Sequence, residues 1–407
     1  MSLFTSVLTR KIVTNQIKER EFNMFIFLFI LFVVIWFIYD LKIAKRPTHK
    51  RNYPNRFGDY HFFSEGKKLF EVFFQDIKNA QTEILIHFYI VKRDWLSEEF
   101  MRLLIESAQK GVKVKLMLDW FGSISIKRKW VKDLKKAGGE VRFSYVPKFP
   151  HLFQTLMVRN HQKIAVIDRY HCFIGGLNVG KEYVDEHPKL TPWRDYHLKI
   201  SGDIGKDFVR EFNDIWNGKT AAFENDQKLS GDIQLIPYEN GSMEKQFLAY
   251  FGNAKEKIMI GTPYFFPTDN IFQSLISAIK RGVKIELVVP YTQDHWLVWE
   301  ASIPYLHKLL ALGATVHQYK NGFYHAKFLS IDSSFAELGT FNFNKRSFLL
   351  NEEINCKFTN PITVSFLQQK IQEDILDSDL LDIKKITHLS LWTKIKSQFA
   401  NLISNYL

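Results

Sequence analysis

The feature that most constrains the fold of this chain is an internal duplication. Residues 83–119 and 257–290 share one order: an apolar stretch, a helical stretch, a basic residue followed by glycine, and a second apolar stretch. The apolar stretches are rich in β-branched residues and leucine, which indicates strands with helices on both sheet faces. Lys110-Gly111 and Arg281-Gly282 stand where each helix is predicted to end, because glycine readily follows a last helical turn.

The parallel between the two segments continues further along the chain. Residues 131–138 and 305–313 each look like a helix that ends in glycine, and each leads to a short strand. We therefore expect an α/β protein of two similar units, joined near residues 217–242, a polar stretch with three glycines. Since ligand sites prefer domain interfaces, a site shared between the units is the simplest arrangement.

One polar pattern occurs in both units: a histidine, a lysine two residues later and, after four further residues, an aspartate. Residues two apart on a strand share a face, so each histidine and its lysine are predicted to point the same way. A cation beside a nucleophile or proton donor suits a phosphate group. The candidate catalytic residues are therefore His161, Lys163 and Asp168 in the first unit and His325, Lys327 and Asp332 in the second.

The aspartates of this pattern stand seven residues after their histidines. On a regular strand this odd spacing places Asp168 and Asp332 on the face opposite to the histidines. We expect these two aspartates mainly to fix the turns that follow, which can begin at Asp168-Arg169 and Asp332-Ser333.

Further polar residues follow each copy of the pattern. The segments Gly175-Gly-Leu-Asn178 and Gly339-Thr-Phe-Asn342 combine glycine, which lets backbone approach a phosphate, with an amide that can donate to phosphate oxygen. Asn178 and Asn342 are therefore candidate phosphate-binding residues. Farther along stand Asp195 and Glu353, which we expect to orient the catalytic histidines by accepting from their second ring nitrogen.

The duplicated pattern resembles the phospholipase D superfamily, and several segments resemble bacterial cardiolipin synthases. These segments are IHFYI at 86–90, GGLNVGKEY at 175–183, WRDYHLKI at 193–200, TPYFFP at 262–267 and FYHAK at 323–327. The resemblance covers roughly residues 60–407. It implies an α/β fold of two pseudo-symmetric phospholipase D-like α/β/α units with a shared active site, preceded by one transmembrane helix.

The same resemblance implies a phosphatidyltransferase that makes cardiolipin and glycerol from two phosphatidylglycerol molecules through a phosphohistidine. It implies His161 as nucleophile and His325 as acid, without a metal or other cofactor, because the lysines and asparagines stabilise the developing charge. Two differences from the family are visible. Many relatives carry two N-terminal spans where this chain shows one, and Asn344 stands where the family usually has aspartate, which bears on acceptor preference.

Near the N-terminus, residues 24–39 are sixteen apolar residues without a charge. A bilayer core of about 30 Å asks for roughly 20 residues, so a short transmembrane helix is predicted, with a buried core helix as the alternative. A cleaved signal peptide is disfavoured, because Tyr39-Asp40-Leu41-Lys42 offers no small-residue cleavage site. Basic residues are more numerous after the span than before it, which predicts a single-pass protein of the cell membrane with a cytoplasmic catalytic portion.

These features predict six consecutive segments. They are an N-terminal flank at 1–23, a transmembrane helix at 24–43, a first phospholipase D-like domain at 56–217, a linker at 218–241, a second such domain at 242–383 and an amphipathic C-terminal helix at 384–407. The last segment repeats apolar residues at spacings of three and four, among four lysines and no acid: Trp392, Ile395, Phe399, Leu402 and Tyr406. Such a helix can lie on an anionic membrane or pack on the protein's own core, and both possibilities stay open.

The formal net charge of +12 favours anionic partners. We expect phosphatidylglycerol and anionic membrane lipid as partners and no nucleic acid, because no stacking or groove-reading motif accompanies the charge. The alternatives are a phospholipase D-type hydrolase or other phosphatidyltransferase, a nuclease-like phosphodiesterase, and an inactive membrane scaffold. The oligomeric state is not predicted.

Other residues that carry reactive groups are expected to be structural. We expect His87 to be packed in the core, Asp94 and Asp119 to be loop or helix-cap residues, and two cysteines to be buried free thiols. The cysteines are Cys172 and Cys356. The histidines expected to be surface or structural residues are His151, His171, His187 and His388.

Overall fold

The computed structural model describes residues 2–43, 51–218, 223–224 and 231–404. Contacts divide the chain into two compact units. The smaller unit consists of Met1–Arg46 and Pro147–Met157, and the larger unit consists of Pro47–Val146 and Val158–Leu407. The larger unit contains both sequence repeats, so the two units are described separately.

The first repeat forms a mixed sheet with the strand order β15-β8-β7-β6-β3-β4-β5, and β2 also pairs with β8. Parallel pairing joins β3, β4 and β5, whereas β6 and β7 run antiparallel to their neighbours. The strands are β2 (Asp59–Glu65), β3 (Glu83–Phe88), β4 (Lys113–Asp119), β5 (Glu140–Ser144), β6 (Ile164–Ile167), β7 (His171–Gly175), β8 (Trp193–Ser201) and β15 (Phe323–Tyr324).

The second repeat forms a sheet with the order β10-β19-β17-β16-β11-β13-β14-β20. Its central order from β19 to β14 matches the order from β8 to β5 in the first sheet, which confirms two pseudo-symmetric α/β units. The strands are β10 (Ile233–Tyr238), β11 (Lys257–Gly261), β13 (Lys284–Pro290), β14 (Thr315–Tyr319), β16 (Phe328–Ile331), β17 (Phe335–Gly339), β19 (Glu353–Phe358) and β20 (Ser378–Leu380). A separate two-residue pair joins β12 (Phe265–Phe266) to β18 (Phe343–Asn344).

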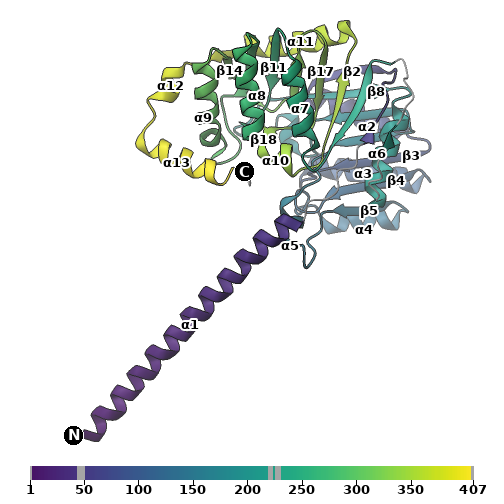
Figure 1. Ribbon diagram of the computed structural model, residues 1–407. Coiled ribbons are helices and arrows are strands. Elements are labelled where there is room, and N and C mark those ends of the chain that lie inside the picture. The colour runs from purple at the N-terminus through teal and green to yellow at the C-terminus, as the bar shows by residue number, and fades with distance from the viewer. Residues whose placement is uncertain (1, 44–50, 219–222, 225–230, 405–407) are drawn as a thin grey trace. The chain divides into compact units, whose positions relative to one another are not determined.

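Helices cover both faces of each sheet (Figure 1). In the first repeat, α2 (Gly66–Asn79), α3 (Trp95–Gln109) and α4 (Arg128–Lys136) cover one face, and α6 (Gly205–Asn217) covers the other. In the second repeat the outer helices are α7 (Ser242–Asn253), α8 (Asp269–Lys280) and α9 (Val298–Ala311), and α11 (Pro361–Leu376) is the inner one. Shorter helices are η1 (Lys181–Val184), α10 (Lys345–Leu349), α12 (Ile383–Thr387) and α13 (Leu391–Leu402).

The inner faces of the two sheets share one hydrophobic core. This core joins residues of the first repeat, such as Leu85 and Val166, to residues of the second, such as Leu338. Cys172 and Cys356 belong to it as buried free thiols, as predicted. Because burying apolar surface drives the packing of the two inner faces, the shared core holds the repeats in one orientation.

Several local predictions are confirmed. The carboxylate of Asp94 accepts a hydrogen bond from Ser97 N at 3.0 Å and so caps α3. Gly111 and Gly282 follow the ends of α3 and α8 with φ values of 91° and 92°, in the region that favours glycine.

Elements of the structure cross the predicted segment boundaries in several places. The predicted linker contains β10, which pairs with β19 and belongs to the second sheet. It also contains β9 (Phe223–Glu224), which pairs with β1 (Arg51–Asn52), while residues 219–222 and 225–230 lie outside the described residues. The predicted C-terminal helix is two helices, α12 and α13, and Tyr406 lies outside the described part of the chain.

The smaller unit consists of α1 (Ser2–Ile43) and a segment that contains α5 (Leu152–Met157). Residues 18–40 of α1 are long and apolar enough to cross a membrane, and the most apolar window within them is not buried as a core helix would be. The carboxylate of Asp40 accepts from the backbone N–H groups of Phe153 and Gln154 at 2.8 and 3.1 Å and caps α5. Part of the predicted first domain therefore packs with the N-terminal helix, while residues 44–50, with Lys45, Arg46 and Lys50, lie outside the described residues.

Candidate active site

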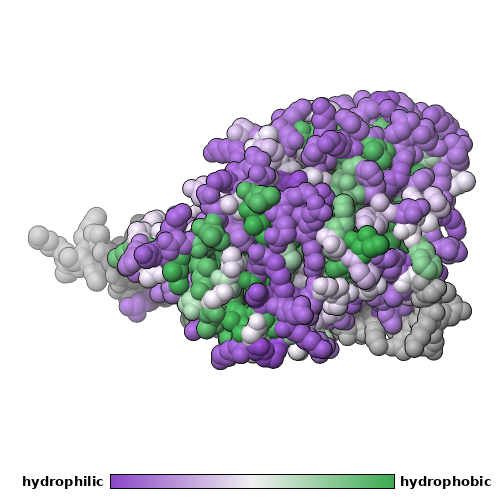
Figure 2. All heavy atoms as spheres, turned by 90° about the horizontal axis from the view of Figure 1, so that it is seen from above, coloured by the Kyte–Doolittle hydropathy of each residue, from purple (hydrophilic) through white to green (hydrophobic). Residues whose placement is uncertain are grey.

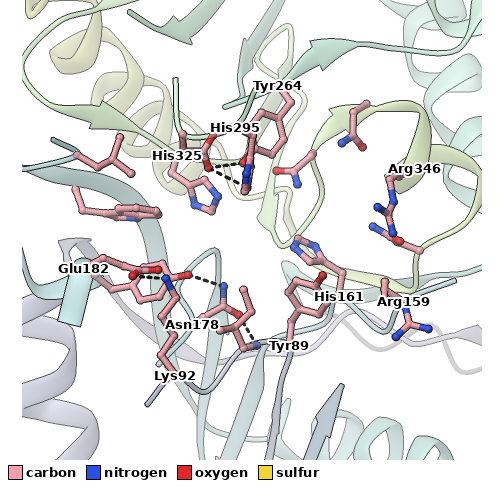
Figure 3. Close-up of a pocket in the computed structure, with 18 of the residues that line it drawn as sticks. Tyr89, Lys92, Arg159, His161, Asn178, Glu182, Tyr264, His295, His325 and Arg346 are labelled. Atoms are coloured by element: carbon pink, nitrogen blue, oxygen red, sulfur yellow. Dashed lines mark hydrogen bonds and ion pairs between the residues drawn. The ribbon is translucent and has the colours of Figure 1, made fainter. Parts of the chain in front are cut away.

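His161 and His325 line one cavity of about 340 Å³ inside the larger unit. Each histidine stands in a short extended segment directly before the strand that follows it, β6 for His161 and β16 for His325. Because β6 and β16 hold equivalent places in the two sheets, the duplicated fold delivers the two imidazoles to facing sides of the cavity (Figure 3).

Each histidine is held by a carboxylate from the other repeat. Nδ1 of His161 lies 2.8 Å from Oε2 of Glu353, and Nδ1 of His325 lies 2.7 Å from Oδ2 of Asp195. The pairs therefore cross between the repeats. A carboxylate on Nδ1 leaves Nε2, on the opposite side of the ring, as the nitrogen that can meet a substrate.

Backbone pairing explains why the pairs cross. The N–H of His161 donates to the carbonyl of Glu352 at 2.9 Å, directly before Glu353. The N–H of His325 donates to the carbonyl of Arg194 at 2.7 Å, directly before Asp195, and β15 adds to the edge of β8. Each histidine segment thus runs alongside the carboxylate segment of the other repeat, which puts the two side chains within hydrogen-bonding distance.

The two carboxylates are buried and kept ionised by their neighbours. Burial alone raises the pKa of Glu353, but His161 and Lys163 lower it overall. The hydroxyls of Thr340 and Ser347 also donate to Glu353, each at 2.6 Å.

Burial likewise raises the pKa of Asp195, and Lys327 and His325 lower it overall. The backbone N–H of Tyr196 also lies 2.7 Å from this carboxylate. An ionised carboxylate fixes which ring nitrogen of its histidine carries the proton.

Burial favours the neutral form of both histidines. Burial lowers the pKa of His161 to about 4 and that of His325 to about 4, although the partner carboxylates oppose this shift. The neighbouring lysines lower both values further. A neutral imidazole has a free lone pair, so either ring can act as a nucleophile or a base.

The lysines of the pattern lie behind the histidines, fully buried. Lys163 Nζ donates to the backbone carbonyl of His161 at 2.8 Å. Lys327 Nζ donates to the carbonyl of His325 and lies 3.0 Å from Nε2 of the same residue. Burial lowers the pKa of Lys163 to about 7 and that of Lys327 to about 8, while the carboxylates Glu353 and Asp195 work against this.

The two candidate phosphate-binding asparagines both line the cavity. The amide of Asn178 is held on both sides, because Oδ1 accepts from Ile90 N at 3.1 Å and Nδ2 donates to the Tyr183 hydroxyl at 3.0 Å. Oδ1 of Asn342 is buried and finds no hydrogen-bond partner among the described residues. The two asparagines thus occupy equivalent places with different freedom to reorient.

Asp168 and Asp332 lie outside the cavity, at the far ends of β6 and β16. Asp168 accepts from the backbone N–H groups of residues 81–83 and from the Thr82 hydroxyl, at 2.7 to 3.1 Å. Asp332 accepts from the backbone N–H groups of residues 255–257 at 2.8 to 3.0 Å. Both therefore tie a turn to the start of β3 or β11, rather than fixing only the turn that follows them.

Most of the other cavity residues were not predicted to be site residues from the sequence. Lys92, Glu182, Asp294, His295, Arg159 and Arg346 supply charge or proton-transfer groups there, and Tyr89 and Tyr264 flank the histidines. Several of them directly follow a strand or one of the polar patterns, which was the signal available in the sequence.

Three residues expected to be structural need comment. His87 is fully buried, as predicted, and burial lowers its pKa to about 3. His187, expected to be a surface or structural residue, lines the cavity. Asp119 holds Arg159, a cavity residue, through Nη1 at 3.2 Å, besides accepting from three backbone N–H groups, so it supports the cavity wall.

Both repeats match a known protein family. A family profile described as "Cardiolipin synthase, PLD-like domain" matches residues 73–216 and 247–375. The minor cardiolipin synthase ClsB of Bacillus subtilis (strain 168) is 33% identical over 373 residues, which cover 88% of this chain and 94% of the relative. The major cardiolipin synthase ClsA of the same organism is 32% identical over 359 residues, 84% of this chain and 74% of the relative.

A solved structure supports the fold alone. The phosphatidylserine synthase of Haemophilus influenzae Rd KW20 superposes with a TM-score of 0.72 at 14% identity, over 91% of this chain and 100% of that chain.

Proposed function

Because the chain belongs to the cardiolipin synthases of the phospholipase D superfamily, we propose that it transfers a phosphatidyl group between two phosphatidylglycerol molecules. The observation that carries this proposal is the pair of carboxylate-held histidines on facing sides of one cavity. Two such groups, each able to bind and release a proton, are what a two-step transfer at phosphorus requires.

In the proposed first step, Nε2 of His161 attacks the phosphorus of the donor phosphatidylglycerol. A phosphorus–nitrogen bond forms and the bond from phosphorus to the glycerol oxygen breaks. His325 gives its proton to that oxygen, and glycerol leaves. The anionic phosphodiester supplies the charge that raises the pKa of the neutral His325 so that it can carry this proton.

In the proposed second step, the terminal hydroxyl of another phosphatidylglycerol enters from the side that glycerol left. His325 now accepts the hydroxyl proton, and the oxygen attacks phosphorus while the bond to His161 breaks. Cardiolipin is released and both histidines return to their starting states. The same residue acts as acid and then as base, as expected when the two steps mirror each other.

The residues around the histidines support these steps. Lys163 and Lys327 place positive charge behind the two rings, where it stabilises the added negative charge of a five-coordinate phosphorus. Asn178 and Asn342 face the cavity, and the amide of Asn342 can turn toward a phosphate oxygen. Glu353 and Asp195 hold the rings and stabilise their positive charge.

We also assign the chain to the cell membrane, with α1 crossing it once and the catalytic portion on the cytoplasmic side. The exposed apolar surface of residues 18–40 supports the crossing. The excess of basic residues after the span supports the orientation. Protease digestion of intact cells and of inverted vesicles tests it: cleavage of the catalytic portion only in inverted vesicles is expected.

The central experiment incubates the purified full chain with labelled phosphatidylglycerol and separates the lipid products. Equal amounts of cardiolipin and glycerol are expected. Phosphatidic acid as the sole lipid product would instead indicate a hydrolase, and cleavage of DNA but not of lipid would indicate a nuclease. The absence of turnover by a folded protein would favour the scaffold reading.

A further inference from the structure

The two ends of the cavity carry different charged residues although they come from equivalent repeats. Glu182 and Arg346 each stand four residues after the phosphate-binding asparagine of their repeat. Arg159 stands two residues before His161, where the second repeat has Phe323 before His325. The His161 end therefore holds two guanidinium groups, whereas the other end holds Glu182 with its ion-pair partner Lys92 (Figure 3).

The two arginines lie in a setting that favours a bound anion. Arg159 is 1% exposed, and its Nε finds no hydrogen-bond partner among the described residues. Its two Nη atoms lie 3.2 Å from Asp119 Oδ1 and 3.4 Å from the carbonyl of Tyr145. Burial, and then the charge of Arg159, lower the pKa of Arg346. Although Arg159 is paired with Asp119, its buried Nε keeps an unused N–H donor that can bind an anion.

We propose that Arg159 and Arg346 bind the phosphodiester of the acceptor lipid, which does not react. This inference rests on the proposed function, since cardiolipin formation brings a second phosphodiester into the cavity. The reacting phosphorus lies between the histidines, so the second anion needs a site of its own. Guanidinium groups suit it, because they can donate two parallel hydrogen bonds to one phosphate.

The test compares two acceptors of the same phosphatidyl group, phosphatidylglycerol and free glycerol. Cardiolipin formation uses a charged acceptor, whereas exchange of labelled glycerol into phosphatidylglycerol uses an uncharged one and needs the same phosphohistidine. In R346Q, cardiolipin formation is expected to fall about tenfold more than glycerol exchange. R346K, which keeps the charge but loses the paired donors, is expected to give an intermediate ratio.

The matched control is K92Q, which removes a cation at the other end of the cavity, where Lys92 pairs with Glu182. It is expected to leave the ratio of the two reactions unchanged. Equal losses of both reactions in R346Q and R346K would overturn the acceptor subsite. A wild-type chain that exchanges glycerol but makes no cardiolipin would instead overturn the proposed function.

A separate observation concerns α13. This helix packs against α9 through small residues: Ser397 and Ala400 are buried, and the Ser397 hydroxyl donates to the carbonyl of Glu300 at 2.8 Å. Its large apolar side chains face outward instead, with exposed fractions from 47% to 78%: Leu391, Trp392, Ile395, Phe399 and Leu402. The helix therefore packs on the body with one face and leaves its apolar face open.

Lysines dominate the charge near this apolar face, and one of them, Lys396, lies 3.8 Å from the carboxylate of Glu300 on α9. Residues 384–407 contain four lysines and no acidic residue. Lys384 and Lys385 lie on α12, and Lys394 and Lys396 lie on α13 itself. An apolar face bordered by lysines is the pattern of a helix that lies in the interface of an anionic bilayer. By contrast, the face of the molecule in Figure 2 is largely hydrophilic, with separate small hydrophobic patches.

The position of α13 links this surface to the cavity. Glu300, which anchors Ser397, follows the cavity residues Asp294 and His295 by a few positions on the same segment. At the other end, Lys345 Nζ donates to the Ser404 hydroxyl at 2.9 Å, and Lys345 lies between two cavity residues, Asn344 and Arg346. A bilayer bound to α13 therefore lies beside the segments that form the cavity wall.

The geometry points to α13 as an interfacial helix that docks on an anionic bilayer and presents the cavity to it. The test labels the full-length F399C variant with an environment-sensitive fluorophore, which is selective because Cys172 and Cys356 are buried. In proteoliposomes that contain phosphatidylglycerol, a blue shift and quenching by lipid-borne quenchers are expected. Emission that stays unshifted in these vesicles would overturn the docking, whatever the activity.

A second measurement uses activity. The double variant W392S/F399S is expected to lose severalfold more activity on phosphatidylglycerol in vesicles than in detergent micelles, because docking matters only for a bilayer. The matched control is I362S, which removes an apolar side chain from α11 that is more exposed, at 81%, than either Trp392 or Phe399. Equal vesicle-to-micelle ratios in the double variant and in I362S would count against the docking.

Discussion

The two repeats of this chain reach the same arrangement around their histidines with different neighbours. Glu353, which holds His161, accepts from two hydroxyls, whereas Asp195, which holds His325, accepts from a backbone N–H and lies 3.8 Å from Lys327. Lys163 reaches only the backbone of its histidine, but Lys327 also reaches the ring. The duplicated strands therefore set the positions of the two histidines, while neighbouring side chains that differ between the repeats set their electrostatic environment.

The comparison also shows that neither repeat is a complete site. Each histidine depends on a carboxylate supplied by the other repeat, through strands that pair across the boundary. The pairing fixes the two histidines at once, so the geometry of one end of the cavity depends on both repeats.

The largest expected effect comes from removing a histidine. H161A and H325A are each expected to lower cardiolipin formation by about 1000-fold or more, because nucleophile and acid act as one unit. Mass spectrometry of the wild-type chain trapped during turnover is expected to find a phosphatidyl group on His161. A modified His325 peptide would reverse the assignment, and circular dichroism checks that both variants fold.

The crossed carboxylates give the next largest effect. E353Q and D195N are each expected to lower turnover by about 100-fold, because an amide no longer stabilises the positive charge of the ring it contacts. D195N lies in the first repeat but should alter the histidine of the second. NMR titration of His325 is expected to show a lowered pKa in D195N, since Asp195 raises it. An unchanged His325 titration would contradict the crossed arrangement.

The pH dependence of kcat/KM tests the lowered pKa values of the two lysines. The pKa of Lys163 is lowered to about 7 and that of Lys327 to about 8. Each is charged below its pKa and loses the charge as pH rises, so kcat/KM is expected to fall above about pH 7 to 8. On the acidic side, His161 has to be neutral to attack phosphorus and its pKa is lowered to about 4, so the rate should rise as pH increases through that value. A flat profile from about pH 6 to 9 would contradict the lowered lysine values.

The smallest effect is expected from the aspartates of the pattern. D168N and D332N are each expected to lower the free energy of unfolding by about 1–2 kcal/mol, because each loses charge-assisted hydrogen bonds to backbone N–H groups. The loss should be larger for D168N, since Asp168 also accepts from the Thr82 hydroxyl. Urea denaturation measures both, and turnover per folded molecule should stay within severalfold of the wild type. Complete inactivation of a folded variant would return these aspartates to a direct catalytic role.

Much of the fold was accessible from the sequence because its signals are local. Strand and helix periods, and glycines such as Gly111 and Gly282, depend on a few neighbouring residues. The short strands expected after residues 138 and 313 are present as β5 and β14. Distant pairing is less accessible from the sequence: β10 lies within the predicted linker and pairs with β19 at the edge of the second sheet.

The sequence by itself determined the two α/β repeats, the N-terminal apolar helix and the two histidines, because these depend on local periodicity and on a motif written twice. Only the tertiary structure decided which carboxylate meets which histidine. It also placed Asp168 and Asp332 outside the cavity, Arg159 and Arg346 at one end of it, and the apolar face of α13 outward. The physical reason is that periodicity fixes the direction of a side chain along its own strand or helix, whereas its partner is set by packing between segments 130 or 192 residues apart.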